Sequence, residues 1–508
     1  MVFIRRKKNK SGSSSIQIID KSSGKYLVVA TLGCVKDEEQ ERLLIEQAYE
    51  LFPALTKQGQ FDFKFSEDDV FIQQLREGFR KIHVVGPELV LGKIFDDVGY
   101  SNIPDSLFRP LVITRLVYPG SKLKTAEYLQ QYKGIYISTD KIYRYLDKFN
   151  STHQQTAIDL TFKHTKQILE DQITVAFYDI TTLYFEASDE DDLRKLGFSK
   201  DGKAQNPQVL LALLVGTGGQ PLAYEVFEGD TFEGHTLIPV IQAFKKKYKL
   251  PSLVVVADAG LLSKENITGL IGLQYPFILG ARLKNETEKV KAQILEETFK
   301  DGKTFTIQKE NNIRLIVNYS AKRARKDEHQ RKQGLERLEK SLRTGKLTKN
   351  HINNRGYNKY LTIKNEITVA IDYKAYKADS KWNGLKGYVT NSGLTESEII
   401  DNYRHLWTIE KAFRISKTDL RIRPVYHRLE RRIKTHICIA FCSYKIYKEL
   451  ERLLAIKKTG ISVERALREL QTIYQAMVML PKSRKKANVL LPLNEQQAAI
   501  LKLLEVKF

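Results

Sequence analysis

Two aspartates interrupt otherwise apolar runs of this sequence. Asp179 lies in VAFYDITTLYFEA (residues 175–187), and Asp258 lies in SLVVVADAGLLSKEN (residues 252–266). The β-branched and aromatic residues around them predict buried strands, in which an unpaired carboxylate is costly. A turn aspartate explains either residue alone. On neighbouring strands, the two together would offer the oxygen ligands that Mg²⁺ prefers, and a pair of such ions can activate water and stabilise the leaving oxygen of a phosphodiester.

A run of polar residues at helical spacing surrounds a third acid, Glu410. The segment is NYRHLWTIEKAFRISK (residues 402–417). A single helix turning by about 100° per residue would carry one stripe of side chains. The stripe consists of Tyr403, Leu406, Glu410, Arg414 and Lys417. This mixture is not typical of a core face, and we expect Trp407 to pack beside it. A surface helix with internal salt bridges is the alternative interpretation.

The charge of the chain indicates a polyanionic partner. Its 508 residues include 83 Lys and Arg against 60 Asp and Glu, a formal net charge of +23. A basic excess of this size favours nucleic acid. Three cysteines cannot form a disulfide framework, which indicates a reducing cytosol, and we expect Cys438 and Cys442 to pack in a core. The sequence shows no signal peptide and no run of 18 apolar residues, so we expect no membrane association.

Ahead of the acidic strands, the sequence predicts two regions. Residues 1–80 indicate a strand hairpin and a helix, and residues 81–165 a helical DNA-binding region. Within the second region, TAEYLQQYKGIYISTDKIYRYLDKFN predicts two helices with a break at Gly134 and a cap at Ser138 or Thr139. The second helix would present Arg144 and Lys148 as a recognition helix does. An ordinary helical hairpin with a basic face is the equal alternative.

The remaining regions predict an α/β catalytic core. Residues 166–290 show three meandering strands followed by βα units, which favours a mixed sheet flanked by helices. Residues 291–390 predict a β-rich insertion with a basic helix. The core resumes over residues 391–450, and residues 451–508 predict C-terminal helices. The expected fold is therefore a mixed sheet with an insertion, between mainly helical N- and C-terminal regions.

These motifs resemble those of a known family. The order Asp179, Asp258, Glu410 is similar to the DDE triad of bacterial insertion-sequence transposases, whose core is RNase H-like. The segment around Glu410 resembles the signature Y-x2-R-x3-E-x6-K of one class of these enzymes. Tyr403 and Lys417 match that spacing, whereas Leu406 occupies the Arg position. The predicted strands also resemble the RNase H-like order, and an insertion of the class's type accounts for the separation of 152 positions from Asp258 to Glu410.

The resemblance implies a function. The chain would bind the ends of an insertion sequence and catalyse DNA cleavage and strand transfer in cut-and-paste transposition. Asp179, Asp258 and Glu410 would bind two Mg²⁺ ions, with Mn²⁺ as a substitute. The implied partners are double-stranded DNA, as terminal inverted repeats and as target, and a second copy of the chain on that DNA. The implied location is the bacterial cytoplasm, at the nucleoid.

The resemblance also implies DNA contacts near the acids. Tyr403 and Lys417 would hold the terminal phosphate. Because Leu406 cannot supply the motif's cation, we expect Arg414 to act with Lys417, and we expect Arg404 to face elsewhere on the helix. Trp382 would stack on a flipped base, with packing inside the insertion as the alternative.

Two other functions compete with a transposase. The first is a catalytically degenerate DNA-binding regulator, which would bind DNA ends without cutting them. The second is a haloacid-dehalogenase-like phosphatase, since Thr181 follows Asp179 at the position where that family has a second acid. The phosphatase leaves both the net charge and the stripe around Glu410 unexplained. Metal-dependent cutting of a DNA end distinguishes the three functions.

Overall fold

The computed structural model describes residues 1–56, 67–170, 173–199, 202–250, 253–353, 356–364, 368–480 and 483–503. The chain forms two compact units. The first comprises Met1–Arg80 with Val478–Lys486, and the second comprises Lys81–Met477 with Ala487–Phe508. All of the acidic residues singled out above belong to the second unit.

The first unit is built on a three-stranded antiparallel sheet of order β1-β2-β3. Its elements are β1 (Val2–Lys8), β2 (Ser14–Asp20), β3 (Leu27–Val35), α1 (Glu38–Thr56) and α2 (Glu67–Gly78). The predicted hairpin is β2 with β3, and the basic opening segment adds β1 as a further strand. Ile16, Ile18 and Ala48 are buried between the sheet and α1, because alternate residues of β2 face the helix.

Helices form one part of the second unit around a long central helix, α15 (Glu430–Ile456). The others are α3 (Gly86–Asp97), α4 (Phe108–Val117), α5 (Lys122–Lys133), α6 (Thr139–Thr152), α7 (Gln154–Ile168), α16 (Val463–Leu470) and α17 (Glu495–Leu503). α15 contacts α3, α4, α6 and α7, and most of its side chains are buried. Cys438 and Cys442 lie in this core as free thiols. The helices of residues 81–165 therefore share a core with the C-terminal part of the chain.

The mixed sheet of the second unit confirms the predicted α/β fold. Its first five strands are β5 (Val175–Tyr184), β6 (Gln208–Val215), β7 (Pro221–Glu228), β8 (Val254–Ala257) and β9 (Phe277–Ala281). Their order is β7-β6-β5-β8-β9. β5, β6 and β7 pair antiparallel, whereas β8 and β9 run parallel to β5. This is the strand order that the RNase H-like resemblance implied. One face packs on the helices around α15 and the other on α8 (Leu237–Tyr248) and α9 (Lys264–Gly272).

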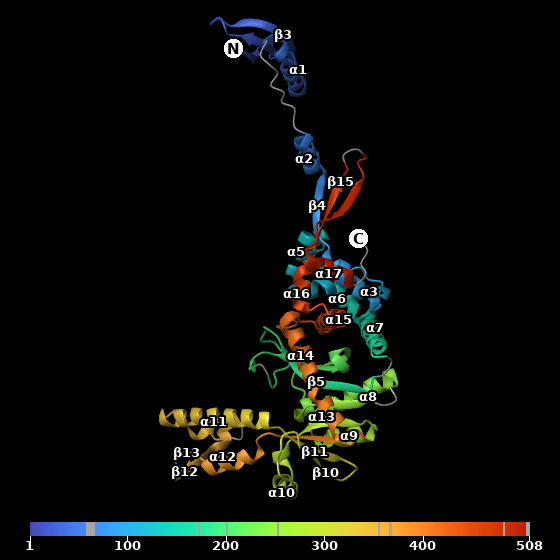
Figure 1. Cartoon of the computed structure of the whole chain (residues 1–508), viewed down its shortest axis with the longest axis vertical. Helices are drawn as coiled ribbons and strands as arrows, with labels where there is room; N and C mark the ends of the chain where they lie inside the picture. Colours follow the sequence, from blue (N-terminus) through green and yellow to red (C-terminus); the bar gives the residue numbers. More distant parts are fainter. Residues whose placement is uncertain are drawn as a thin grey trace. The chain divides into compact units, whose positions relative to one another are not determined.

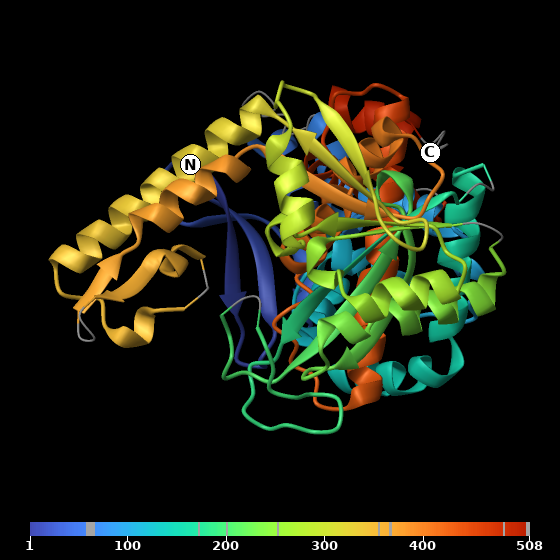
Figure 2. The same cartoon turned by 90° about the horizontal axis from the view of Figure 1, so that it is seen from below.

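The insertion enlarges this sheet instead of forming a separate β module. β10 (Thr304–Gln308), β11 (Arg314–Tyr319) and β14 (Leu385–Thr390) pair antiparallel with one another and join the sheet at β9. The longest element of the insertion is a basic helix, α11 (Ala321–Arg343). It packs with β12 (Leu361–Lys364), β13 (Thr368–Ile371) and α12 (Tyr373–Asp379) around a small core of its own. Figures 1 and 2 show this group projecting to one side of the sheet.

The sequence predicted only helices in the C-terminal region, but the structure also has two strands there. β15 (Tyr474–Met479) and β16 (Lys486–Leu490) form a three-stranded sheet with β4 (Phe79–Val84). These strands are short, and a short apolar run does not distinguish a strand from a helix by periodicity. Among the described residues, no helix is long and apolar enough to cross a membrane.

Candidate functional site

The fold brings Asp179 and Asp258 together on adjacent parallel strands. Tyr178 of β5 is the register partner of Ala257 of β8, so the two aspartates are the next residues along each strand. Asp179 lies within β5 and not at its end, and Asp258 directly follows β8. Side chains alternate across a sheet. Because Phe177 and Val256 both face the core around α15, the two carboxylates project from that same face.

Backbone amides hold one oxygen of each carboxylate. Asp179 Oδ1 accepts a hydrogen bond from the amide of Ile180 at 2.7 Å. Asp258 Oδ1 accepts a hydrogen bond from the amide of Gly260 at 2.8 Å. This bond caps the start of the short turn that follows β8. Both side chains are only partly buried. The carboxylates are therefore oriented by the chain and remain reachable from solvent.

Two short helices carry the stripe around Glu410, and not the single helix that the spacing predicted. α13 (Glu396–Arg404) begins with a capping box between Thr395 and Glu398, and α14 (Trp407–Arg414) follows after a break. At the break, the amide of Ile409 bonds to the carbonyl of Leu406 three residues earlier at 3.1 Å. A π turn (Ile415–Asp419) then ends α14. The tight turn at the break and the wide π turn rotate the chain by other amounts than an α-helix does. The α-helical rotation of about 100° per residue therefore does not predict the directions of these side chains.

Tyr403 links the helices to the acidic strands. α13 contacts β8 and β9, and α14 contacts β5 and β6. A Cβ added at Gly280 of β9 would come within 2.3 Å of the Tyr403 hydroxyl and 2.9 Å of the Ala259 amide. The phenol thus lies against the residue after Asp258. Burial, followed by the negative charges of Asp258 and Glu410, raises the pKa of Tyr403, so both acids act on this one hydroxyl.

The structure places the remaining stripe residues differently. Leu406 is 7% exposed and belongs to the core. Glu410 and Arg414 are exposed, and Lys417 is partly buried in the π turn. Arg414 lies near the Asp419 carboxyl. Burial, followed by the negative charge of Glu464, raises the pKa of Asp419, and the positive charge of Arg414 opposes this rise.

Of two sequence expectations about neighbouring residues, the one for Trp407 is wrong and the one for Arg404 stays a prediction. Trp407 was expected to pack beside the stripe, but it is 55% exposed because the break turns it outward. Arg404 was expected to face away from the site. It forms an ion pair with Asp401 at 3.0 Å, and its charge also lowers the pKa of Tyr388 against the larger raising effect of burial. Tyr388 packs on Tyr403 with ring centroids 4.9 Å apart, so the charge of Arg404 acts on a ring beside Tyr403, and the direction of the Arg404 side chain stays a prediction.

A cavity of about 320 Å³ opens beside Asp258. Its lining includes Ala259, Gly280, Trp382, Lys386, Arg323 and Tyr403. Trp382 is partly buried against the core, and it also lines the cavity. Packing and contact with a displaced base, the two roles expected from the sequence, are therefore both compatible with its position. Lys386 was not singled out in the sequence. The only signal for it was its place four residues after Trp382 in KWNGLKGYVTN.

The acidic side chains of the site are suitable metal ligands, although the described residues form no group of three potential ligands. Within the described ranges, no three His, Cys, Asp or Glu side chains are gathered closely enough to hold an ion. Carboxylate oxygens are the donors that divalent hard cations take. Asp179 and Asp258 are candidate donors whose spacing is set by strand register, whereas the third candidate, Glu410, lies exposed on a separate short helix.

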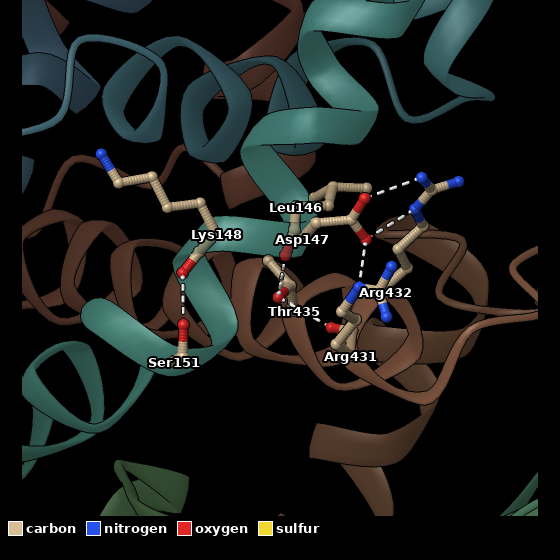
Figure 3. Close-up of polar contacts among 7 residues, drawn as sticks. All are labelled: Leu146, Asp147, Lys148, Ser151, Arg431, Arg432 and Thr435. Atoms are coloured by element: carbon tan, nitrogen blue, oxygen red, sulfur yellow. Dashed lines mark hydrogen bonds and ion pairs between the residues drawn. The ribbon is translucent and has the colours of Figure 1, made fainter.

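The predicted recognition helix is α6, capped by Ser138, whose hydroxyl accepts from the Lys141 amide at 3.2 Å. Its apolar side packs on α15, where Asp147 accepts from Arg432 at 2.8 and 2.7 Å and from Arg431 at 2.8 Å. Figure 3 shows the Lys148 side chain pointing away from this contact. Arg144 and Lys148 are both exposed, so one face of α6 is anchored and another carries free cations.

A family model with the description "Transposase DDE domain" matches residues 152–446, more than half of the chain. The chain belongs to this family of DNA-cleaving and strand-transferring enzymes, and it is a transposase. The match excludes the phosphatase considered above. Members of this family generally use divalent metal ions. No curated protein sequence matches the chain.

Two solved structures are similar over part of their length. A piggyBac transposase synaptic complex with hairpin DNA is 8% identical and covers 79% of each chain at a TM-score of 0.37. A Mos1 transposase paired-end complex with the left transposon end is 11% identical and covers 48% of this chain and 78% of the other at a TM-score of 0.16. Scores this low establish no correspondence between individual residues.

Proposed function

We propose that this transposase binds the ends of an insertion sequence and cuts and joins DNA with Asp179, Asp258 and Glu410. The observation that carries the proposal is the register of β5 and β8, which sets the two aspartates side by side on the face covered by α13 and α14. Glu410 is the proposed third acid because α14, the helix that carries it, contacts β5, the strand of Asp179. A carboxylate trio on a basic chain suits phosphodiester chemistry.

The three carboxylates would hold the divalent ions, Mg²⁺ by preference with Mn²⁺ as a substitute. When bound, these ions supply an activated water and stabilise the leaving oxygen of the phosphodiester. The chain's own contribution is orientation. The amides of Ile180 and Gly260 fix the two aspartates, and α14 presents Glu410 as an exposed carboxylate. Tyr403, Arg414 and Lys417 would contact the terminal phosphate, and Trp382 a displaced base.

The exposed face of α6 would bind the terminal inverted repeats through Arg144 and Lys148. Both side chains are exposed on a helix whose opposite side is fixed to α15. The same chain would then engage target DNA after cleavage. Because an element has two ends, we propose that two copies of the chain act together as a homodimer on DNA.

Cleavage of a duplex that carries the inverted repeats flanking the gene tests this function. We expect the full-length protein to cut this duplex in Mg²⁺ or Mn²⁺. In Ca²⁺ we expect binding only, because calcium's looser coordination positions water poorly. Asp179→Asn, Asp258→Asn and Glu410→Gln should each lose cleavage by at least about a hundredfold and keep end binding, since affinity comes mainly from cations on phosphates.

Glu336→Gln is the matched control, since Glu336 is an exposed glutamate on α11. It should cut DNA as the unmodified protein does. A triad variant with full activity would remove that residue from the site. If the unmodified protein binds the ends and cuts nothing in any of these ions, the chain is the degenerate regulator and the catalytic assignment is wrong.

A further inference from the structure

Lys386 is a partly buried cation without an acidic partner. It lies on β14, and its Nζ sits 4.4 Å from the ring centroid of Tyr403 and 5.6 Å from that of Tyr388. Lys386 forms no ion pair with any described residue, although charged side chains surround it. An ammonium removed from water without a carboxylate is costly, and cation–π contacts offset only part of that cost. Such a residue is suited to an anion that arrives from outside.

The charges around Lys386 are mostly positive. Burial, and then the charges of Arg323 and Arg404, lower the pKa of Lys386 to about 8, while Glu410 opposes them. The lysine therefore stays protonated at neutral pH, at an energetic cost that a bound anion would relieve. Another lysine on the same cavity, Lys284, differs in this respect, because it is paired with Asp379 at 2.7 Å.

The cavity extends from Lys386 to Ala259, the residue after Asp258. Small residues line the wall between them: Ala259 directly follows Asp258, and Gly280, Ala281 and Gly387 belong to the neighbouring strands. Tyr403 spans this wall, with its ring under Lys386 and its hydroxyl beside the Ala259 amide. A phosphate that reached Lys386 would thus lie on the same tyrosine that Asp258 and Glu410 act upon.

We propose that Lys386 binds a backbone phosphate of the DNA strand that enters the catalytic carboxylates, and that the ring of Tyr403 holds the lysine in place for that contact. This proposal rests on the catalytic site proposed above. It adds a cation beside Tyr403, whose segment holds a buried leucine at position 406 instead of the motif's arginine. The ligand is the DNA phosphodiester itself, and no free nucleotide is required.

The test measures end binding and cleavage by the full-length chain for Lys386→Met and for the matched control Lys284→Met. Binding is measured in Ca²⁺ at several salt concentrations, so that the slope of log K against log salt counts phosphate contacts. Loss of one contact lowers this slope by about 0.9. We expect Lys386→Met to show that decrease and to cut at least about tenfold more slowly. Lys284→Met removes an equal charge that Asp379 already neutralises, and it should keep both values.

Lys386→Arg should restore the slope and most of the cleavage, because a guanidinium also binds a phosphate; a merely structural role for the side chain would predict neither result. Lys386→Gln gives the same measurement if the methionine variant unfolds, which thermal melting reports. The proposal is overturned if Lys386→Met keeps the unmodified slope and rate, or if Lys284→Met loses as much. Failure of the triad variants to lose cleavage is a separate result, which affects the catalytic assignment and leaves the slope measurement valid.

Discussion

At the scale of single residues, the site depends on which side chains converge on Tyr403. Its ring contacts Tyr388 and Lys386. Its hydroxyl lies beside Gly280 of β9 and the amide of Ala259, the residue after Asp258. Gly280 makes this approach possible, since a side chain there would occupy the position of the hydroxyl. Tyr403 is therefore a candidate positioning residue for Lys386 as well as a candidate DNA contact, because its ring packs against that cation.

The two arginines near Glu410 give a prediction at the same scale. Arg404 acts on Lys386 and Tyr388, and Arg414 is exposed at the end of α14. We expect Arg404→Ala and Arg414→Ala each to weaken end binding and to lower the salt slope by about 0.9, the value for one lost phosphate contact. Binding titrations at several salt concentrations measure this. An unchanged slope for Arg404→Ala would restore the ranking inferred from the sequence, in which Arg414 alone acts with Lys417.

At the scale of elements, the sequence predicted the parts whose local pattern matches their surroundings. The buried strands β5, β6 and β8 have near-continuous apolar runs, so the core sheet and both aspartates could be found. The break between α13 and α14 could not, because Leu406 and Ile409 continue a helical pattern and only their three-residue hydrogen bond shows the tighter turn. Lys386 was missed for a related reason: its role arises from α13 lying over β14, a tertiary contact that no local pattern encodes.

The anchored helix α6 gives a prediction at the element scale. Its Asp147 contact with Arg431 and Arg432 (Figure 3) fixes the helix, so its exposed cations can bind DNA without moving the core. We expect the double variant Arg144→Ala/Lys148→Ala to bind ends more weakly, with a salt slope reduced by about 1.8 at about 0.9 per contact. Lys163→Ala on α7, which is also exposed, is the control for general charge. Equal losses in both proteins would mean that α6 has no special role.

This test requires the full chain. The helices of residues 81–165 bury their apolar sides against α15, so a fragment ending at 165 would expose that core surface. Discrimination between the inverted repeat and a scrambled duplex adds a second measurement. A base-reading helix changes the ratio of the two affinities when its cations are removed, whereas a helix that contacts only phosphates lowers both affinities alike.

At the scale of the whole molecule, buried cations and histidines oppose one another within the helical core. Arg115, Lys122 and His436 are all buried, with His436 Nδ1 3.4 Å from Lys122 Nζ. Burial and the charge of Arg115 lower the pKa of Lys122 well below its usual value. Burial, followed by the charges of Lys122 and Arg115, lowers the pKa of His427 to about 3. The folded chain thus favours the neutral form of these imidazoles, first because burial disfavours their charged form and then because the neighbouring cations repel further positive charge.

A pH dependence of stability follows from His427. Its pKa is about 3 when folded, against the ordinary value of 6.5, so the unfolded chain takes up a proton first as the pH falls. Above pH 6.5 the free energy of unfolding does not depend on this group. As the pH falls from 6.5 toward 3, the free energy of unfolding decreases by up to about 1.4 kcal/mol per pH unit. We expect the melting temperature of His427→Gln to fall less steeply than that of the unmodified protein between pH 6.5 and 4.5. His329→Gln, at an exposed position on α11, should melt with the unmodified slope. Parallel curves for all three proteins would show that His427 is protonated in the folded chain and that its cationic neighbours do not exclude the charge.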